Sequence, residues 1–456
     1  MIWKKVRGPS FGAAWLVTLL SATVSLGGES YGADAQAADT GLQEERARRS
    51  GSTMLVVPSP LGLDWCLERA REANPDLAQI AAVAEAARYR IDSAGTFEDP
   101  RLAYDASNIP TGDFDFDSTP LSGHQFGLRQ KLPFPGLLSN QKTAARRGAE
   151  ASELLVHDRR LMIDGAVEAA WAELGFAQSA RDITNRNVDL LRQLAATAES
   201  RYRVGSGLQQ DVLRAQVELT VLLQERLRRT EAVENAESAL IVLLDLPADL
   251  SFPPTEALNL SADEPRLSHL LSTLEEKNAR IRSAGLRVEE ARSRIRVAEL
   301  EGMPDVDFGL GYRIRKNVRG DTVEGDDFLS AGLTLRLPIN RSKWRARVAE
   351  QRANLRRTEA DLRGLRGMLF ARTRNAHAAL VRASSEEALL ETGLVPQARQ
   401  SLEASRAAYK VGRIEFLSLL DSQVQLLGAE LRLVRARADK RLAFAALESA
   451  SGEKLR

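Results

Sequence analysis

The sequence predicts an α+β membrane protein in which long helices carry four short β-strands, with one structural unit repeated twice. Three observations lead to this prediction. Ala, Leu, Arg and Glu dominate the 456 residues, and aromatic residues make up only 5%, a composition typical of long helices and coiled coils. Four segments alternate apolar and polar residues with the period of a strand. A turn between two helical segments occurs twice, in the same sequence context.

The first 35 residues have the pattern of a secretory signal peptide. Three basic residues precede an apolar run from Phe11 to Leu26, and small residues around positions 33–37 offer cleavage sites. An N-terminal membrane anchor is the alternative, although the run is short for a membrane span. No later stretch reaches 18 uninterrupted apolar residues, so we expect the mature chain to leave the cytoplasm without a transmembrane helix.

Composition and motifs exclude several functional classes. A net charge of +1 gives no field that would attract nucleic acid. The single cysteine, Cys66, excludes a disulfide framework and a cysteine-based metal site, and its position is too deep and too polar for lipid attachment. The four histidines have no ligand spacing, and no catalytic motif is present. We therefore expect no enzyme, cofactor, metal site or lipid anchor.

The first half of the mature chain, residues 61–258, is predicted to follow a flexible lead over residues 36–60. A helical pattern with a possible break at Asn74-Pro75 precedes two segments of strand alternation, which an exposed loop separates. Two more helices follow, and the first would be about 95 Å long, a length normal for a coiled coil. The predicted elements cover residues 64–94, 100–109, 123–132, 139–203 and 208–244.

The second half, residues 259–456, repeats this order of elements. Pro304 corresponds to Pro100 at an offset of 204 residues, and Leu337-Pro338 corresponds to Leu132-Pro133 at an offset of 205. Because the offset drifts only from 204 to 207, we interpret nearly the whole mature chain as a tandem duplication. The predicted strands and helices cover residues 304–315, 328–337 and 342–410, with a last helix that ends near residue 449.

The repeated turn lies between the two long helices of each half. It reads Tyr-Arg-Val-Gly at residues 202–205 and Tyr-Lys-Val-Gly at residues 409–412, an offset of 207. A downstream Leu and Gln match at the same offset. Because glycine can adopt a positive φ and end a helix, we interpret each copy as the tip of an αα-hairpin.

The four predicted strands each have an apolar face and a polar or charged face. Strands of about ten residues match the wall of a transmembrane β-barrel, although a soluble sheet with one buried face alternates in the same way. The membrane barrel is favoured because the chain is expected to be exported and because the strands lie where the helices cannot cover them. Four strands cannot close a barrel and open edges are excluded in lipid, so several copies must assemble. The side chains expected to face a wet lumen are Arg129, Lys131, Asp305, Asp307, Arg313, Arg315 and Arg336.

The order of elements, the two tips and the Leu-Pro joins together resemble the TolC-like outer-membrane factors of tripartite efflux pumps, over roughly residues 61–449. The resemblance implies a homotrimer in which each chain gives four strands to a 12-strand barrel in the outer membrane, above a long helical barrel in the periplasm. It implies a periplasmic adaptor protein and an inner-membrane pump, usually of the RND type, as partners, and small toxic compounds or metal cations as cargo. A type I secretion outlet for polypeptides and an exported coiled-coil scaffold without a pore are the alternatives.

The resemblance also implies a gate at the periplasmic tips, built in the family from acidic residues just after the turn. Asp211 and Asp421 match that pattern, although a carboxylate in the first turns of a helix also stabilises the helix dipole. In the second half, Ser418 occupies the position that corresponds to Asp211. In the first half, Arg214 occupies the position that corresponds to Asp421, so a symmetric acidic ring is not expected. The residues expected to form the tip turns and the adaptor-docking surface are Tyr202, Gly205, Gly207, Tyr409, Gly412 and Arg413.

Overall fold

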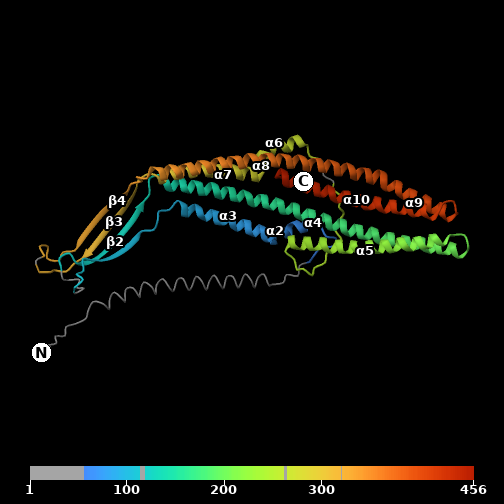
Figure 1. Ribbon diagram of the computed structural model, residues 1–456, viewed down its shortest axis with the longest axis horizontal. Helices are drawn as coiled ribbons and strands as arrows, with labels where there is room; N and C mark the ends of the chain where they lie inside the picture. Colours follow the sequence, from blue (N-terminus) through green and yellow to red (C-terminus); the bar gives the residue numbers. More distant parts are fainter. Residues whose placement is uncertain (1–55, 113–118, 261–263, 320, 456) are drawn as a thin grey trace, which may run out of the picture. The chain divides into compact units, whose positions relative to one another are not determined.

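The computed structural model describes residues 56–112, 119–260, 264–319 and 321–455. The predicted signal peptide and most of the predicted lead lie outside the described residues. The elements below belong to one unit, residues 58–456, with a sheet at one end and two hairpin tips at the other (Figure 1). Among the described residues, no helix combines the length and apolarity needed to cross a membrane.

The described elements follow one order twice. Each half has two helices, two strands and then a pair of long helical segments that form a hairpin. The first half contains α2 (Leu63–Ala73), α3 (Pro75–Ala94), β1 (Arg101–Ser107), β2 (Gly123–Leu132), α4 (Leu137–Arg203) and α5 (Gln209–Leu244). The second half contains α6 (Leu267–Lys277), α7 (Ala279–Glu301), β3 (Asp305–Ile314), β4 (Phe328–Arg336), α8 (Arg341–Leu389), α9 (Val395–Lys410) and α10 (Phe416–Ser451).

An asparagine joins the first two helices of each half. The Oδ1 atom of Asn74 accepts a hydrogen bond from the N–H of Asp76 at 3.0 Å, and Asn278 caps α7 in the same way. The amide of Asn74 also donates to the carbonyl of Leu243 at 2.9 Å, and that of Asn278 donates to the carbonyl of Ala450 at 3.1 Å. Each asparagine therefore starts one helix and ties it to the last helix of its half.

The long helical segment of the second half is interrupted, whereas the sequence pattern predicts a single helix. A π-helical turn, Leu390–Leu394, separates α8 from α9. Pro396, the second residue of α9, has no N–H to donate to the carbonyl of Thr392, and its ring crowds that carbonyl. A π turn is a common way to absorb such a defect without ending the helix.

The four strands form one antiparallel sheet in the order β1-β2-β3-β4. The two strand pairs of the sequence analysis are therefore joined, because β2 of the first half pairs with β3 of the second half. In that pairing Phe126 lies opposite Tyr312, and Leu128 lies opposite Leu310. One face of the sheet thus carries the apolar residues of all four strands, as the alternation predicts.

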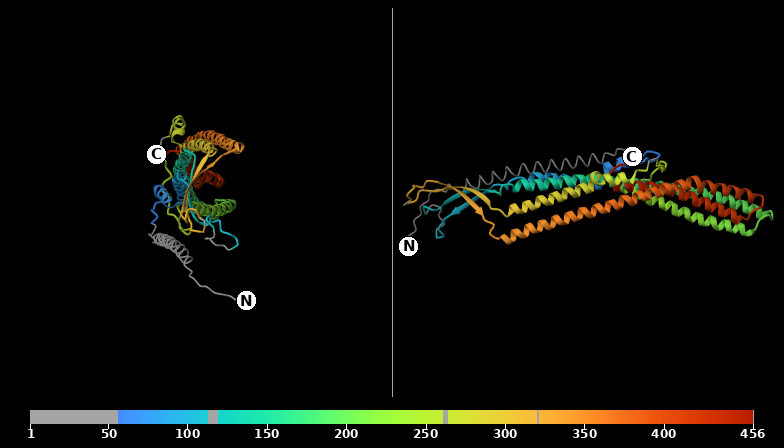
Figure 2. Two further views of the ribbon diagram at one scale, coloured as in Figure 1. Left: turned by 90° about the vertical axis from the view of Figure 1, so that its left-hand side faces the viewer. Right: turned by 90° about the horizontal axis from the view of Figure 1, so that it is seen from above.

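The apolar core lies between the helices. Near the tips, α4, α5, α9 and α10 enclose a cluster that includes Leu194, Leu402 and Phe416. Farther from the tips, the buried indole of Trp171 donates a hydrogen bond to the carbonyl of Leu61 at 3.0 Å. Figure 2 shows the helices running side by side along the unit. α4 packs against α2, α3, α5, α7 and α10 and contributes more buried residues than any other described helix.

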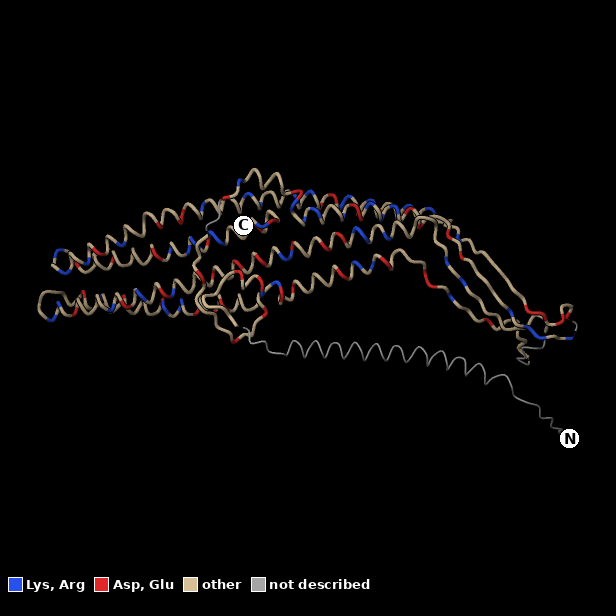
Figure 3. The backbone as a smooth tube through the Cα atoms, turned by 180° about the vertical axis from the view of Figure 1, so that it is seen from behind, with Lys and Arg blue, Asp and Glu red and all other residues tan. Residues whose placement is uncertain are grey.

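Ion pairs connect the helices in the middle of the unit. The buried carboxylate of Asp164 on α4 contacts Arg71 of α2 at 2.6 Å and Lys454 at 2.9 Å. Burial by itself would raise the pKa of this carboxyl, but the two cations hold that pKa below its ordinary value. Asp158 on α4 likewise contacts Arg280 of α7 at 2.7 Å. Charged residues are spread along the long helices (Figure 3).

Candidate functional site

The apolar face of the sheet is open to its surroundings. In the views of Figures 1 and 2, none of the helices in the described part of the chain covers this face. In β4 every residue is exposed, and Leu329 and Leu333 are 76% and 74% exposed. Exposed residues on the other strands extend the same patch: Leu102, Tyr104, Phe126, Leu128, Leu132, Phe308, Leu310, Tyr312 and Ile314. A contiguous apolar surface of this kind marks contact with a membrane or with another protein.

The opposite face of the sheet carries paired charges. Asp305 contacts Arg336 at 2.7 Å, and Lys131 contacts Glu98, which precedes β1, at 2.6 Å. Lys131 lies opposite Asp307 in the strand register. Six of the seven residues predicted for a lumen therefore share one face: Arg129, Lys131, Asp305, Asp307, Arg313 and Arg336.

Arg315 lies elsewhere than the strand alternation predicts. The residue follows β3, in the loop that leads to β4, and its buried guanidinium forms an ion pair with Asp321. The same guanidinium lies 4.3 Å from the ring centre of Phe328, and the Arg315 N–H donates to Asp327 at 3.0 Å. Arg315 thus orders the loop between the strands, a role that a period-2 pattern cannot reveal once the strand has ended.

The two tip turns have the same backbone. Gly205 and Gly412 have φ values of 73° and 72°, the left-handed conformation that glycine adopts with little strain. Each glycine N–H donates to the carbonyl of the tyrosine three residues earlier, Tyr202 or Tyr409, at 3.0 Å. The next N–H, of Ser206 or of Arg413, donates at 2.9 Å to the carbonyl five residues before it. This is the hydrogen-bond pattern of a Schellman cap, and it is repeated at the offset of 207.

The side chains of the two tips are arranged differently. Tyr409 is buried, with 4% of its surface exposed, and its ring contacts Phe416 at a centroid distance of 5.6 Å. Tyr202, its counterpart, is 44% exposed. In the first tip Gly207 allows a close approach, since an added Cβ would lie 3.0 Å from the Cβ of Arg201.

Arg201 connects the two tips. Its guanidinium donates to the carbonyl of Tyr409 and lies 4.8 Å from the centre of that tyrosine ring. A second guanidinium nitrogen donates to the carbonyl of Ser206 at 3.2 Å, within its own tip. Arg201 is not among the residues predicted from the sequence, although one signal was present: at the offset of 207, Arg201 corresponds to Ala408. An arginine beside only one of the two turns can make a contact that the alanine beside the other turn cannot make.

The four predicted gate residues lie on the first turns of α5 and α10. Asp211 is half-buried. Burial raises the pKa of Tyr409 in the second tip, and the charge of Asp211 raises that pKa further. Arg214, Ser418 and Asp421 are exposed. In the described part of this single chain, Arg214 forms no ion pair with Asp421. The tips therefore present unpaired charges to whatever lies beside them.

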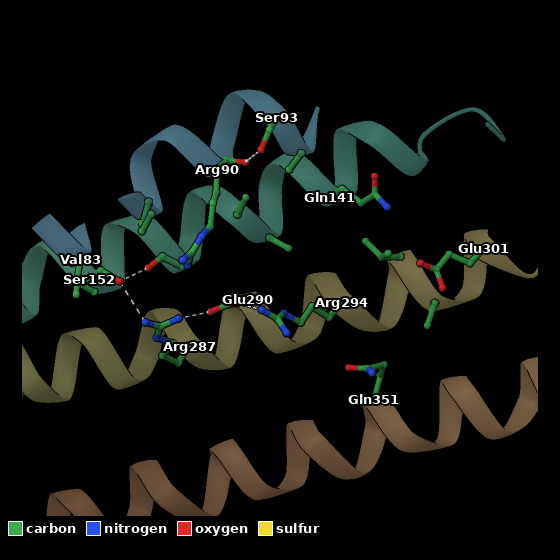
Figure 4. Close-up of a pocket in the computed structure, with 18 residues that line it drawn as sticks. Val83, Arg90, Ser93, Gln141, Ser152, Arg287, Glu290, Arg294, Glu301 and Gln351 are labelled. Atoms are coloured by element: carbon green, nitrogen blue, oxygen red, sulfur yellow. Dashed lines mark hydrogen bonds and ion pairs between the residues drawn. The ribbon is translucent and has the colours of Figure 1, made fainter. Parts of the chain in front are cut away.

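A polar groove lies between the helices (Figure 4). It has a volume of about 610 Å³ and lies between α3, α4 and α7, with Gln351 of α8 at its edge. On its wall Glu290 contacts Arg287 at 2.9 Å and Arg294 at 2.5 Å. The groove shares Gln141 and Glu301 with a second hollow that reaches the charged face of the sheet. Among the described residues, no cluster of His, Cys, Asp and Glu could hold a metal ion.

Comparisons with known proteins agree with this architecture. The family model described as outer membrane efflux protein matches residues 66–245 and 270–453. Protein CyaE of Bordetella pertussis is 27% identical over 69% of this chain and 68% of its own length. The pyoverdine export outer membrane protein OpmQ of Pseudomonas putida is 24% identical over 86% of this chain and 85% of its own length.

Solved structures show the same fold at low sequence identity. The outer membrane protein VceC from Vibrio cholerae superposes with a TM-score of 0.72 at 18% identity, covering 86% of this chain and 97% of that chain. Its likeness to this chain is one of fold alone. The family model, by contrast, matches more than half of the sequence in two consecutive segments, and the chain therefore belongs to the outer membrane efflux protein family.

Proposed function

We propose that the chain is the outer-membrane channel of a tripartite efflux system, a passive homotrimeric exit duct that opens at its periplasmic tips. The observation that carries this proposal is the open apolar face of the four-stranded sheet, at the opposite end of the unit from the two tips. The two halves, residues 61–258 and 259–456, are tandem duplicates that form one intertwined domain. Their matched caps and tip turns support this duplication.

The sheet supports a barrel made from several copies. β2, β3 and β4 have 9 or 10 residues, the number that a tilted strand needs to cross a bilayer. β1 and β4 are the edges of the sheet, and their unpaired backbone groups cannot remain open in lipid. Edge-to-edge pairing of three copies gives 12 strands, the count implied by the resemblance to TolC-like factors. The apolar face then meets lipid, and the charged face lines a wet lumen.

The helical hairpins extend from this barrel into the periplasm. α4 alone has 67 residues, which at 1.5 Å per residue span about 100 Å. The protein is held by its barrel rather than by a lipid anchor, since its single cysteine, Cys66, is buried in α2. The tips expose matched valines, Val204 and Val411, which support docking of a periplasmic adaptor that brings an inner-membrane pump, of the RND type, to the duct.

The gate is the ring of tips around the inner mouth. Arg201 holds the two tips of one chain together through Tyr409, while Arg214 and Asp421 are exposed and free to pair with a neighbouring copy. Opening requires the tips to move apart. Small toxic compounds or metal cations are the proposed cargo, and the name of the pyoverdine exporter OpmQ favours small molecules over polypeptides. A coiled-coil scaffold without a pore leaves the apolar sheet face unexplained.

Planar-bilayer recording tests the channel and its gate together. We expect the purified oligomer to insert and conduct, and the double substitution Asp211→Ala with Asp421→Ala to raise the single-channel conductance and weaken blockade by cations. The matched control replaces two exposed aspartates far from the tips, Asp249→Ala with Asp361→Ala. A wild-type protein that never conducts overturns the channel. A double variant that conducts and is blocked like the control removes both aspartates from the gate.

A further inference from the structure

A second groove lies on the other side of α7 from the polar groove of Figure 4. Positions 287, 290, 294 and 301 of α7 face the polar groove. Positions 296 and 299 of α7 line the second groove together with Met303, which follows the helix, and Ala298 lies between the two grooves. Helix geometry places positions 296 and 299 on the opposite side of α7 from positions 287, 290 and 294. The polar groove continues onto the charged face of the sheet. The second groove, of about 1110 Å³, therefore opens on the side of the lipid-facing surface.

The upper part of this second groove is apolar and continues that lipid-facing surface. Ile339, which follows β4, is 85% exposed, and Leu337 and Met303 are also exposed. Leu337 is two residues past Leu335, so it extends the apolar face of β4 toward α8. Trp344, on the first turn of α8, lies beside them, and tryptophan favours the boundary between lipid tails and water.

The lower part of the groove is strongly basic. Five arginines line it: Arg296, Arg341, Arg345, Arg352 and Arg356. Its acidic residue, Glu299, contacts Arg296 at 3.0 Å and Arg352 at 3.7 Å. Arg341, Arg345 and Arg356 form no ion pair in the described part of the chain. Guanidinium groups bind phosphate oxygens with two parallel hydrogen bonds, so the free arginines fit a phosphate group.

From this arrangement we propose that the groove between α7 and α8 binds an anionic phospholipid of the periplasmic leaflet. The acyl chains lie against Leu337 and Ile339, and the headgroup phosphate is held by Arg341 and Arg345, one turn apart at the start of α8. Arg356, about 16 Å farther along the helix, adds to the positive charge of the groove. The proposal rests on the proposed function, since it needs the sheet to stand in a membrane. Apolar residues above and unpaired cations below match the order of tails and headgroups in that leaflet. The bound lipid fixes the depth and tilt of the helices below the barrel.

Lipid retention by the detergent-solubilised oligomer tests the site without any substitution. The oligomer is taken from nanodiscs of equal phosphatidylglycerol and phosphatidylcholine, and native mass spectrometry counts the lipids that remain bound. We expect phosphatidylglycerol to be retained at least tenfold more than phosphatidylcholine. Equal retention of the two lipids by the wild-type protein overturns the proposal, whatever the variants do.

A charge-reversed variant locates the site. Arg341→Glu, Arg345→Glu and Arg356→Glu together are expected to abolish the preference for phosphatidylglycerol. The control variant reverses three exposed arginines of α8 outside the groove, Arg363→Glu, Arg372→Glu and Arg374→Glu, and keeps the preference. Loss of the preference in both variants, or in neither, overturns the assignment. A groove variant that falls apart into monomers shows instead that a second copy covers the groove, and this also overturns it.

Bilayer recording on the same preparations separates this proposal from the channel. A wild-type protein that conducts but has no lipid preference overturns the lipid site alone. A wild-type protein that neither inserts nor conducts overturns the proposed channel and the lipid site with it. A groove variant that conducts like the wild type and has lost phosphatidylglycerol is the expected result.

Discussion

The two hairpin tips have the same backbone conformation but different side-chain contacts. Gly205 and Gly412 adopt the same φ within a degree, and their caps have the same hydrogen-bond lengths. Yet Tyr202 is largely exposed where Tyr409 is buried, and Leu213 is exposed where Leu420 is buried. The two copies of the turn therefore share a backbone conformation and differ in the side chains that surround it. The second tip packs within the chain, whereas the first leaves apolar surface for a neighbour.

Among matched positions of the two tips, one pair should differ most in the effect of substitution on tip stability. Phe416 is 1% exposed and begins α10, while Gln209, its counterpart at the offset of 207, is exposed and begins α5. Truncating a buried phenylalanine costs about 3–5 kcal/mol, so Phe416→Ala should loosen the second tip. Gln209→Ala should have almost no effect. Hydrogen exchange of tip amides in the assembled protein measures both, and equal protection in the two variants would contradict the difference in packing.

The sequence predicted those features of the fold that depend on local patterns. The bounds of β2, Gly123–Leu132, agree with the period-2 alternation, and the end of α4 agrees with the glycine turn. The π turn at Leu390–Leu394 was not predicted, because it depends on how a helix absorbs a proline. The Arg201 contact was missed as well, since a long side chain can reach many partners and only packing selects one. Period and turn chemistry are local signals, whereas these contacts are tertiary.

Replacing the two tip glycines should show that the backbones are equivalent. An alanine in the left-handed conformation costs about 1 kcal/mol, and neither site adds a rigid clash, because Gly205 has open space and Gly412 faces only the flexible end of Arg201. Gly205→Ala and Gly412→Ala should therefore lower the free energy of tip opening by the same amount in hydrogen exchange. Gly364→Ala, inside α8 with open space around it, is the control and should stabilise its helix slightly. Unequal costs at the two tips would mean that the turns differ in strain.

The smallest effect should come from the two tyrosines and should depend on pH. Burial, and then the charge of Asp211, raise the pKa of Tyr409 above its usual value of 10.0. A raised folded-state pKa means that the stability contributed by the neutral phenol is complete below about pH 10 and is lost as the pH rises through the raised pKa. The wild-type second tip should therefore loosen in strongly alkaline solution, and Tyr409→Phe should abolish that loosening. Tyr202→Phe, at the exposed counterpart, should leave the alkaline transition unchanged. Hydrogen exchange is too fast at such pH, so the near-ultraviolet absorbance and circular dichroism of the three proteins should be compared. A transition that persists in Tyr409→Phe would assign the alkaline loosening to another group and remove this distinction between the tips.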